Sequence, residues 1–203
     1  MREQAIGDWL DELGSSAPAP GGGAAAALLA ATGAALIEMV TNLTIGKPRY
    51  AASEAVMVAA RDEAIRVRAE ALIAASDDER AFDEVAAAYR MPKDDPGRSD
   101  AIQSATAAAA RPPLRTAELA SQVIALAGRI RDGANVNVLS DVAVAAIAAS
   151  AALESAAVNV EVNVAALRDR SVADALRAEL ATHVAAGDSA DETVRTVRAV
   201  IAR

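Results

Sequence analysis

Three consecutive glycines form the first stretch of this sequence that is suited to ligand chemistry. Gly21, Gly22 and Gly23 follow a Pro-Ala-Pro segment and precede a long alanine run. Glycine lets the backbone approach a ligand closely, and the free N–H groups at a helix start attract anions. The loop therefore suits a carboxylate, a phosphate or a polar ring edge. The same glycines also suit a tight turn where two helices cross without room for side chains.

The second such stretch, NLTIGKPRY, runs from Asn42 to Tyr50. It combines hydrogen-bonding groups with the turn residue Gly46 and the cations Lys47 and Arg49. In an acidic chain this is a local basic spot suited to an anionic substrate. A structural alternative is that the helix dipole favours Lys and Arg at a helix C-terminus.

The third feature is a carboxylate on an apolar helix face. At helical spacing Asp78 shares a face with Phe82, Val85 and Tyr89, whereas Asp77 points outward. A carboxylate in that position is either paired or has a raised pKa, and both states suit general acid–base chemistry. The alternative is an N-cap, if a helix restarts at this point.

Polar residues also crowd the start of a later helix and resemble a pocket rim, namely Asn135, Asn137, Ser140 and Asp141. Asp141 also suits the dipole of that helix. Asn159 and Asn163 follow on the same helical stripe, and we expect them to bond the backbone of a neighbouring helix.

Composition predicts an all-α protein. Of 203 residues, 53% are apolar but only 2% are aromatic, so alanine, the best helix former, makes up much of the core. The net charge of −8 argues against nucleic acid as the partner. Without cysteine, and with His183 as the only histidine, a zinc site is not expected. A Mg²⁺ site made of carboxylates alone stays open as an alternative, and no metal is assigned. We interpret His183 as a surface residue without a role.

Periodicity and punctuation predict a bundle of long, alanine-rich antiparallel helices in one domain over residues 1–203. The segment around Asp78 either continues the third helix or restarts it, and ends at Pro92. The other expected helices are Arg2 to Leu13, the glycines to about Asn42, a third from about Ser53, AIQSATAAAA ending before Pro112, Leu114 to about Arg131, Ser140 as N-cap to about Asp169, and one or two from Ser171.

Neither a targeting segment nor a membrane span is expected. The N-terminus carries Asp8, Asp11 and Glu12 where a signal peptide has positive charge. Gly21 to Ile37 is uncharged, but it is short, is dominated by Ala and Gly, and lacks flanking aromatic anchors. We therefore expect a cytoplasmic protein.

Taken together, these stretches resemble the cyclodeaminase/cyclohydrolase family. That family includes the C-terminal domain of formiminotransferase-cyclodeaminase and stand-alone methenyltetrahydrofolate cyclohydrolases. Its motifs P-G-G-G, N-L-T-I-G-K, D-x-x-A-F and N-x-N-x-x-S-D occur in order here. The likeness covers about residues 5 to 170 and leaves 171–203 as a helical tail.

The resemblance implies an all-helical homodimer with a tetrahydrofolate derivative bound in a cleft at or near the subunit interface. It implies Asp78 and Lys47 as catalytic residues, with Lys47 holding a substrate oxygen or lowering the pKa of Asp78. The implied substrate-binding residues are Pro20, Gly21, Gly22, Gly23, Asn42, Gly46, Tyr50, Asn137, Ser140 and Asp141. The folate is the substrate, so no cofactor is implied, and neither nucleic acid nor a membrane is an expected partner.

The implied reaction is hydrolysis of 5,10-methenyltetrahydrofolate to 10-formyltetrahydrofolate. The alternatives are a formimidoyltetrahydrofolate cyclodeaminase, which releases ammonia, and a helical protein that binds folate without turnover. Two positions depart from the family pattern. Ala24 stands where the family usually has serine, and K-P-R-Y stands where it often has successive lysines.

Overall fold

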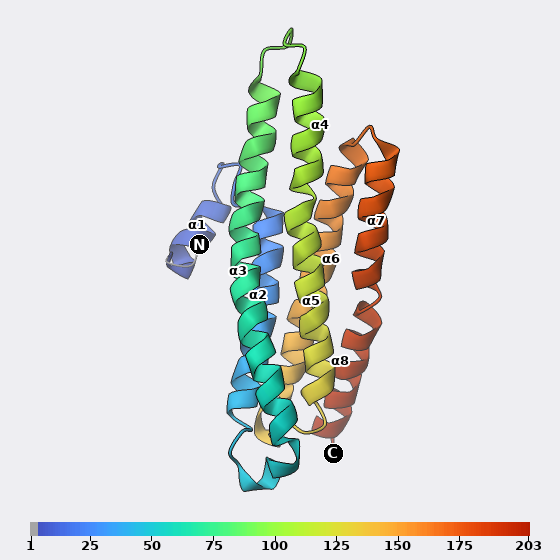
Figure 1. The fold of residues 1–203 in the computed structure, drawn as a ribbon. Coiled ribbons are helices and arrows are strands. Elements are labelled where there is room, and N and C mark those ends of the chain that lie inside the picture. The colour runs from blue at the N-terminus through green and yellow to red at the C-terminus, as the bar shows by residue number, and fades with distance from the viewer. Residues whose placement is uncertain (1–3) are drawn as a thin grey trace.

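Long helices lie side by side along one axis and build most of the described chain (Figure 1). The structure is a computed structural model that describes residues 4–203. No strand occurs within those residues, so the predicted all-α class is confirmed. The helices are α1 (Ile6–Leu13), α2 (Gly22–Asn42), α3 (Glu54–Arg90), α4 (Arg98–Ala109), α5 (Arg111–Ile130), α6 (Leu139–Ala166), α7 (Arg170–Val184) and α8 (Gly187–Ile201), with short 3-10 helices at Pro48–Ser53 and Val136–Val138.

Small residues let the central helices α2, α3, α5 and α6 pack closely. Alanine supplies most of the buried side chains of α2 and many of those of α3 and α6. At Gly33 of α2, an added Cβ would lie 3.1 Å from the Ala145 carbonyl oxygen and 3.1 Å from a Val123 methyl group. Glycine is needed there because a methyl group would push α2 away from α5 and α6.

Helix α3 is continuous for 37 residues, which decides between the two predictions for the segment around Asp78. Asp78 lies inside the helix, so its interpretation as an N-cap is wrong. Helix α5 begins at Arg111, earlier than the predicted Leu114, and Pro112 and Pro113 lie in its first turn. Proline is tolerated there because the first N–H groups of a helix have no intrahelical acceptor.

Ser140 is not the N-cap of α6, contrary to the sequence-based prediction. The helix begins at Leu139, the N-cap position is Val138, and no side chain caps it. Asn135 takes the capping role one turn earlier, where its side chain accepts a hydrogen bond from the Asn137 N–H. The extra 3-10 turn displaced the predicted boundary.

Helix α1 leaves much of its apolar face exposed. Trp9 is buried, but Ile6 and Leu10 are 73% and 52% exposed, and α1 lies beside the bundle (Figure 1). The predicted start at Arg2 lies outside the described residues. At the other end of the chain, the tail forms two helices, α7 and α8, that pack against α5 and α6.

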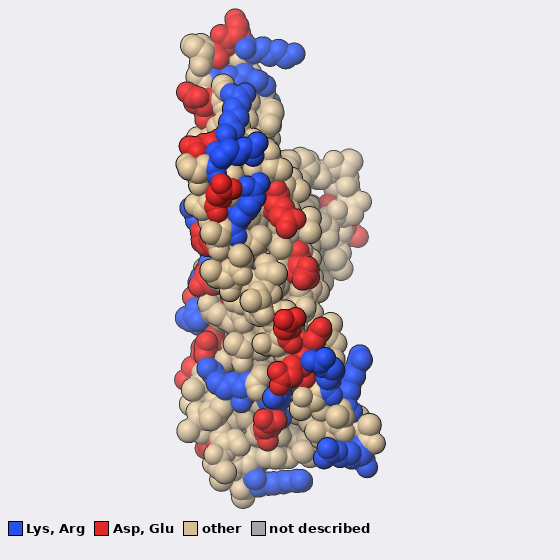
Figure 2. All heavy atoms as spheres, turned by 90° about the vertical axis from the view of Figure 1, so that its right-hand side faces the viewer, with Lys and Arg blue, Asp and Glu red and all other residues tan. Residues whose placement is uncertain are grey.

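Two segments are long and apolar enough to cross a bilayer, namely α2 and Val136–Ala166. Both belong to the bundle, where 56% and 44% of their most apolar windows are buried. A core helix of a helical bundle meets the same criterion. Figure 2 shows positive and negative side chains interspersed along the face beside α7 and α8, without a large area of one sign.

Candidate functional site

A cavity of about 370 Å³ lies where the glycine loop meets α3 and α6. It brings together the predicted glycines and the predicted carboxylate, which are more than fifty residues apart in sequence. Its lining residues are Pro18, Ala19, Gly21, Gly22, Gly23, Asp78, Glu79, Phe82, Val85, Ala109, Asn159, Val162 and Asn163.

The start of α2 lies against polar side chains. A Cβ at Gly23 would overlap the Asp78 carboxylate, whereas a Cβ at Gly22 would be in ordinary contact with Asn159 Nδ2 at 3.6 Å. No side chain caps the N-terminus of α2, which begins at Gly22. The positive end of the helix dipole and its first N–H groups therefore lie at the cavity wall. The structure thus shows the close helix approach at Gly23, and the free N–H groups beside it suit an anionic or polar ligand.

Burial raises the pKa of Asp78 above its ordinary value of 3.8. The backbone N–H of Ala24 partly opposes this effect by hydrogen bonding to the carboxylate, while the charge of Glu79 raises the pKa further. Removal from water disfavours the ionised form, which brings a carboxyl group closer to exchanging protons near neutrality. This direction agrees with one of the two states expected for Asp78, a raised pKa, and it suits general acid–base chemistry.

Phe82, Asn159 and Asn163 also line the cavity, although the sequence did not assign them to the site. Phe82 shares a helix face with Asp78 as predicted, but it is 43% exposed and lines the cavity. Asn163 Nδ2 donates to the Ala109 carbonyl of α4, as predicted for an interhelical amide. Asn159 Nδ2 instead donates to Ser155 of its own helix. The sequence does contain a sign that these asparagines could line a cavity, because they are two amides one turn apart in a largely apolar helix.

Apart from Pro20, the remaining predicted residues lie at the other end of α2. There Tyr50 donates to Asn135 Oδ1 at 3.3 Å and accepts from the Val136 N–H at 3.1 Å. Asn135 also donates through Nδ2 to the Leu43 carbonyl at 2.9 Å. Tyr50 therefore joins the segment after α2 to the segment before α6.

Gly46 and Lys47 form the turn of this second cluster. Gly46 has a φ of +75°, which favours glycine, and its N–H donates to Glu54 Oε2 at 3.3 Å. Lys47 is exposed, and the Arg49 guanidinium lies 5.6 Å from the centre of the Tyr50 ring. Two cations thus remain accessible to an anion in solution.

Within the described chain the two groups of predicted residues do not meet. The 21 residues of α2 separate them, which corresponds to roughly 30 Å of helix. Lys47 is accordingly not among the groups that shift the pKa of Asp78. The residues away from the cavity lining are Pro20, Asn42, Gly46, Lys47, Tyr50, Asn137, Ser140 and Asp141. Pro20 is buried beside Gly21, after a cis peptide bond.

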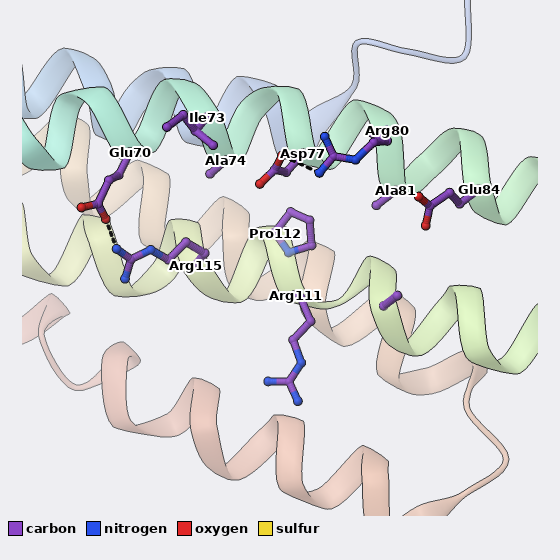
Figure 3. Close-up of a pocket in the computed structure, with 11 residues that line it drawn as sticks. Glu70, Ile73, Ala74, Asp77, Arg80, Ala81, Glu84, Arg111, Pro112 and Arg115 are labelled. Carbon is purple, nitrogen blue, oxygen red and sulfur yellow. Dashed lines mark hydrogen bonds and ion pairs between the residues drawn. The ribbon is translucent and has the colours of Figure 1, made fainter.

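A second cavity, of about 470 Å³, lies between α3 and the junction of α4 with α5 (Figure 3). Its three arginines are each paired with a carboxylate. Arg80 lies 2.7 Å from Asp77, and Arg111 lies 2.8 Å from Glu179. These pairs satisfy the charges locally, so this groove is a weaker candidate for substrate chemistry. Within residues 4–203, no group of three or more His, Asp or Glu side chains is arranged to hold a metal ion.

The chain belongs to the formiminotransferase-cyclodeaminase family, whose sequence pattern matches residues 5–182. It is 41% identical over 197 residues to a methenyltetrahydrofolate cyclohydrolase of Methylorubrum extorquens, with 94% of each chain covered. It is 30% identical over 173 residues to the formimidoyltransferase-cyclodeaminases of rat and mouse. That alignment covers 83% of this chain and 32% of each mammalian protein.

The fold is also that of a formiminotetrahydrofolate cyclodeaminase from Thermotoga maritima, known from its crystal structure. The TM-score is 0.91 at 24% identity, and the match covers 100% of this chain and 99% of the other. At this identity the likeness supports the fold. The function must be argued from the site and from the closer relatives.

Proposed function

We propose that this protein is a methenyltetrahydrofolate cyclohydrolase, which hydrolyses 5,10-methenyltetrahydrofolate to 10-formyltetrahydrofolate. The observation that carries the proposal is the half-buried Asp78 with a raised pKa, set against the glycine-lined start of α2. The cyclohydrolase relative, 41% identical over 94% of both chains, supports the same reaction.

Asp78 performs the proton transfers. As a carboxylate it removes a proton from the water that attacks the carbon of the methenyl bridge, and a carbon–oxygen bond forms. The protonated Asp78 then returns the proton to N5 as the bond from carbon to N5 breaks. The new hydroxyl group loses its proton to give the formyl group on N10, so one proton is released per turnover. A general acid–base of suitable pKa contributes about 10²–10⁴ to the rate.

The cavity also stabilises the reacting charges. The methenyl bridge is an amidinium cation, which the Asp78 carboxylate attracts in a site partly removed from water. The N–H groups at the start of α2 suit the ring carbonyl or the oxygen that develops on the bridge carbon. These steps need no cofactor besides the folate substrate.

The second candidate is a formimidoyltetrahydrofolate cyclodeaminase, since the mammalian relatives carry that name. In that reaction N10 attacks the formimino carbon on N5, and ammonia leaves. Asp78 would protonate the departing nitrogen, so the same cavity serves either reaction.

Two parallel assays separate these functions. Purified protein is added to 5,10-methenyltetrahydrofolate and, separately, to 5-formiminotetrahydrofolate, while the near-ultraviolet absorbance of the methenyl group is followed. Loss of absorbance in the first cuvette above the spontaneous rate identifies the cyclohydrolase. A rise in the second with release of ammonia identifies the cyclodeaminase. If a folded protein changes neither, both enzymatic proposals are wrong and folate binding without turnover takes their place.

We propose further that the protein works as a homodimer that packs along α2. The outward stripe of α2 carries no charge and exposes Leu29, Thr32 and Met39 at helical spacing. Antiparallel packing of two copies of α2 would set the glycine end of one subunit beside the Lys47 end of its partner. Such an arrangement completes a site from the two groups of residues that one subunit holds roughly 30 Å apart.

Mixed dimers test this arrangement. Lys47→Met and Asp78→Asn variants, each inactive alone, are unfolded together, refolded and assayed. If each site takes Asp78 from one subunit and Lys47 from the other, about a quarter of the wild-type activity returns, because half of the dimers are mixed and each has one intact site. If both residues act within one subunit, mixing restores nothing.

A further inference from the structure

Two asparagines on one turn of α6 present unused acceptors to the cavity. Asn159 Nδ2 donates to the Ser155 carbonyl at 2.8 Å, and Asn163 Nδ2 donates to the Asn159 carbonyl at 2.9 Å and to the Ala109 carbonyl at 3.3 Å. A carbonyl oxygen can only accept, so these bonds fix which end of each amide is the nitrogen. The two Oδ1 atoms are therefore the ends left for other partners.

Neither Oδ1 atom accepts a hydrogen bond from the residues that the structure describes. Both side chains line the cavity. The buried polar atoms that lack a partner in residues 4–203 do not include either oxygen, so both oxygens are at least partly accessible. The oxygens thus lie where a ligand can reach them. A ligand that displaces water here without donating hydrogen bonds leaves both oxygens unpaired, and this lowers its affinity. A tightly bound ligand therefore offers N–H groups at this point.

The spacing of the two acceptors suits one amino group. Side chains at i and i+4 of a helix have Cβ atoms about 5–6 Å apart. An exocyclic amino group that donates two bonds of about 2.9 Å in diverging directions joins two oxygens roughly 5 Å apart. Methyl or carbonyl groups at that position leave both oxygens unpaired.

We propose that the Oδ1 atoms of Asn159 and Asn163 hold the exocyclic 2-amino group of the pterin ring and select substrates that carry it. This inference rests on the proposed folate site and assigns two residues to its ring end. The exposed ring of Phe82 lies in the same cavity and offers an apolar face to the planar heterocycle. The two asparagines position the substrate and take no part in proton transfer.

The test compares two competitive inhibitors, 2-amino-4-oxopteridine and 4-oxopteridine, which differ only in the amino group. The wild type is expected to bind the amino compound about tenfold more tightly, the effect of one to two hydrogen bonds. In Asn159→Leu and in Asn163→Leu this ratio should fall toward one. The KM for methenyltetrahydrofolate should rise about tenfold while kcat stays within about threefold.

Ser155→Ala is the matched control. Ser155 Oγ donates to the Ala151 carbonyl of the same helix, and its side chain does not line the cavity. The control removes a comparable bond within α6 and should keep both the ratio and the KM. Circular dichroism verifies that each variant folds.

The outcomes separate this inference from the proposed function. A wild type that hydrolyses methenyltetrahydrofolate but binds both pteridines equally refutes the role of the asparagines and leaves the cyclohydrolase intact. If folded Asn159→Leu and Asn163→Leu proteins both keep the wild-type preference for the amino compound, the role of the asparagines is refuted as well. A ratio that collapses as expected in a protein without turnover supports the amino-group site and refutes the cyclohydrolase.

Discussion

Gly23→Ala tests whether the glycine serves the position of Asp78. Real Cβ atoms almost never approach another heavy atom closer than 3.0 Å, and a Cβ at Gly23 would overlap the carboxyl group well inside that limit. Since the carboxyl group ends a side chain that can rotate, we expect Asp78 to move by on the order of 1 Å. A displacement of that size costs a catalytic group about 10²-fold, or roughly 2.7 kcal/mol of barrier.

The stability of the helix should not fall in parallel. Alanine is a better helix former than glycine by up to about 1 kcal/mol. The matched control is Gly7→Ala, because Gly7 is the second residue of α1 as Gly23 is of α2, and nothing lies within 4 Å of its added Cβ. Both variants should melt at or above the wild-type temperature, and only Gly23→Ala should lose activity.

The assay is kcat/KM for methenyltetrahydrofolate, measured beside a thermal melt. A Gly23→Ala protein that folds and keeps kcat/KM within about threefold of the wild type would refute the reasoning. If Gly23→Ala loses activity and also melts well below the wild type, the substitution has disturbed the packing of the helices and not only the position of Asp78.

Three further predictions concern stability and assembly. Because burial raises the pKa of Asp78 above 3.8, its ionised form costs stability, and this cost grows as pH rises from about 4 through the folded pKa. Asp78→Asn should therefore have a higher melting temperature than the wild type at pH 7 and the same melting temperature near pH 3.5. Equal melting temperatures at pH 7 would contradict this. Tyr50→Phe loses the bonds to Asn135 and Val136 and should lower the melting temperature by about 2–4 °C, for roughly 1 kcal/mol, and an unchanged melt would exclude the structural role. Met39→Asp should convert the proposed dimer to monomers in sedimentation, whereas Ile65→Asp on exposed α3 surface should not; a dimer that survives Met39→Asp would place the interface elsewhere.

The helices and half of the site were predictable because they depend on local signals. Helical spacing placed Asp78 and Phe82 on one face, and the glycines marked the start of α2. The predictions that were wrong concern features that depend on contacts between distant segments. The start of α6 differed from the prediction because Asn135, which caps the preceding 3-10 turn, is held by Tyr50 and Thr44, each more than eighty residues away.

The division of the predicted residues between two ends of α2 was also beyond sequence reasoning. The order of motifs along a chain does not tell how far apart they lie in space. The distance between Lys47 and Asp78 depends on the length of α2, which lies between the two groups of residues. Asn159 was missed for a related reason. Its bond to its own helix, which frees Oδ1 toward the cavity, depends on a side-chain orientation that periodicity does not specify.

The most direct test of the account is the rate at which Asp78→Asn consumes the methenyl chromophore of 5,10-methenyltetrahydrofolate. Asp77→Asn is the matched control, because Asp77 is the adjacent aspartate, lines the second cavity instead of this one and pairs with Arg80 at 2.7 Å. We predict that Asp78→Asn loses about 10²–10⁴ in kcat while Asp77→Asn stays near the wild type. A folded Asp78→Asn protein with near-wild-type turnover would contradict the assignment of the chemistry to this cavity.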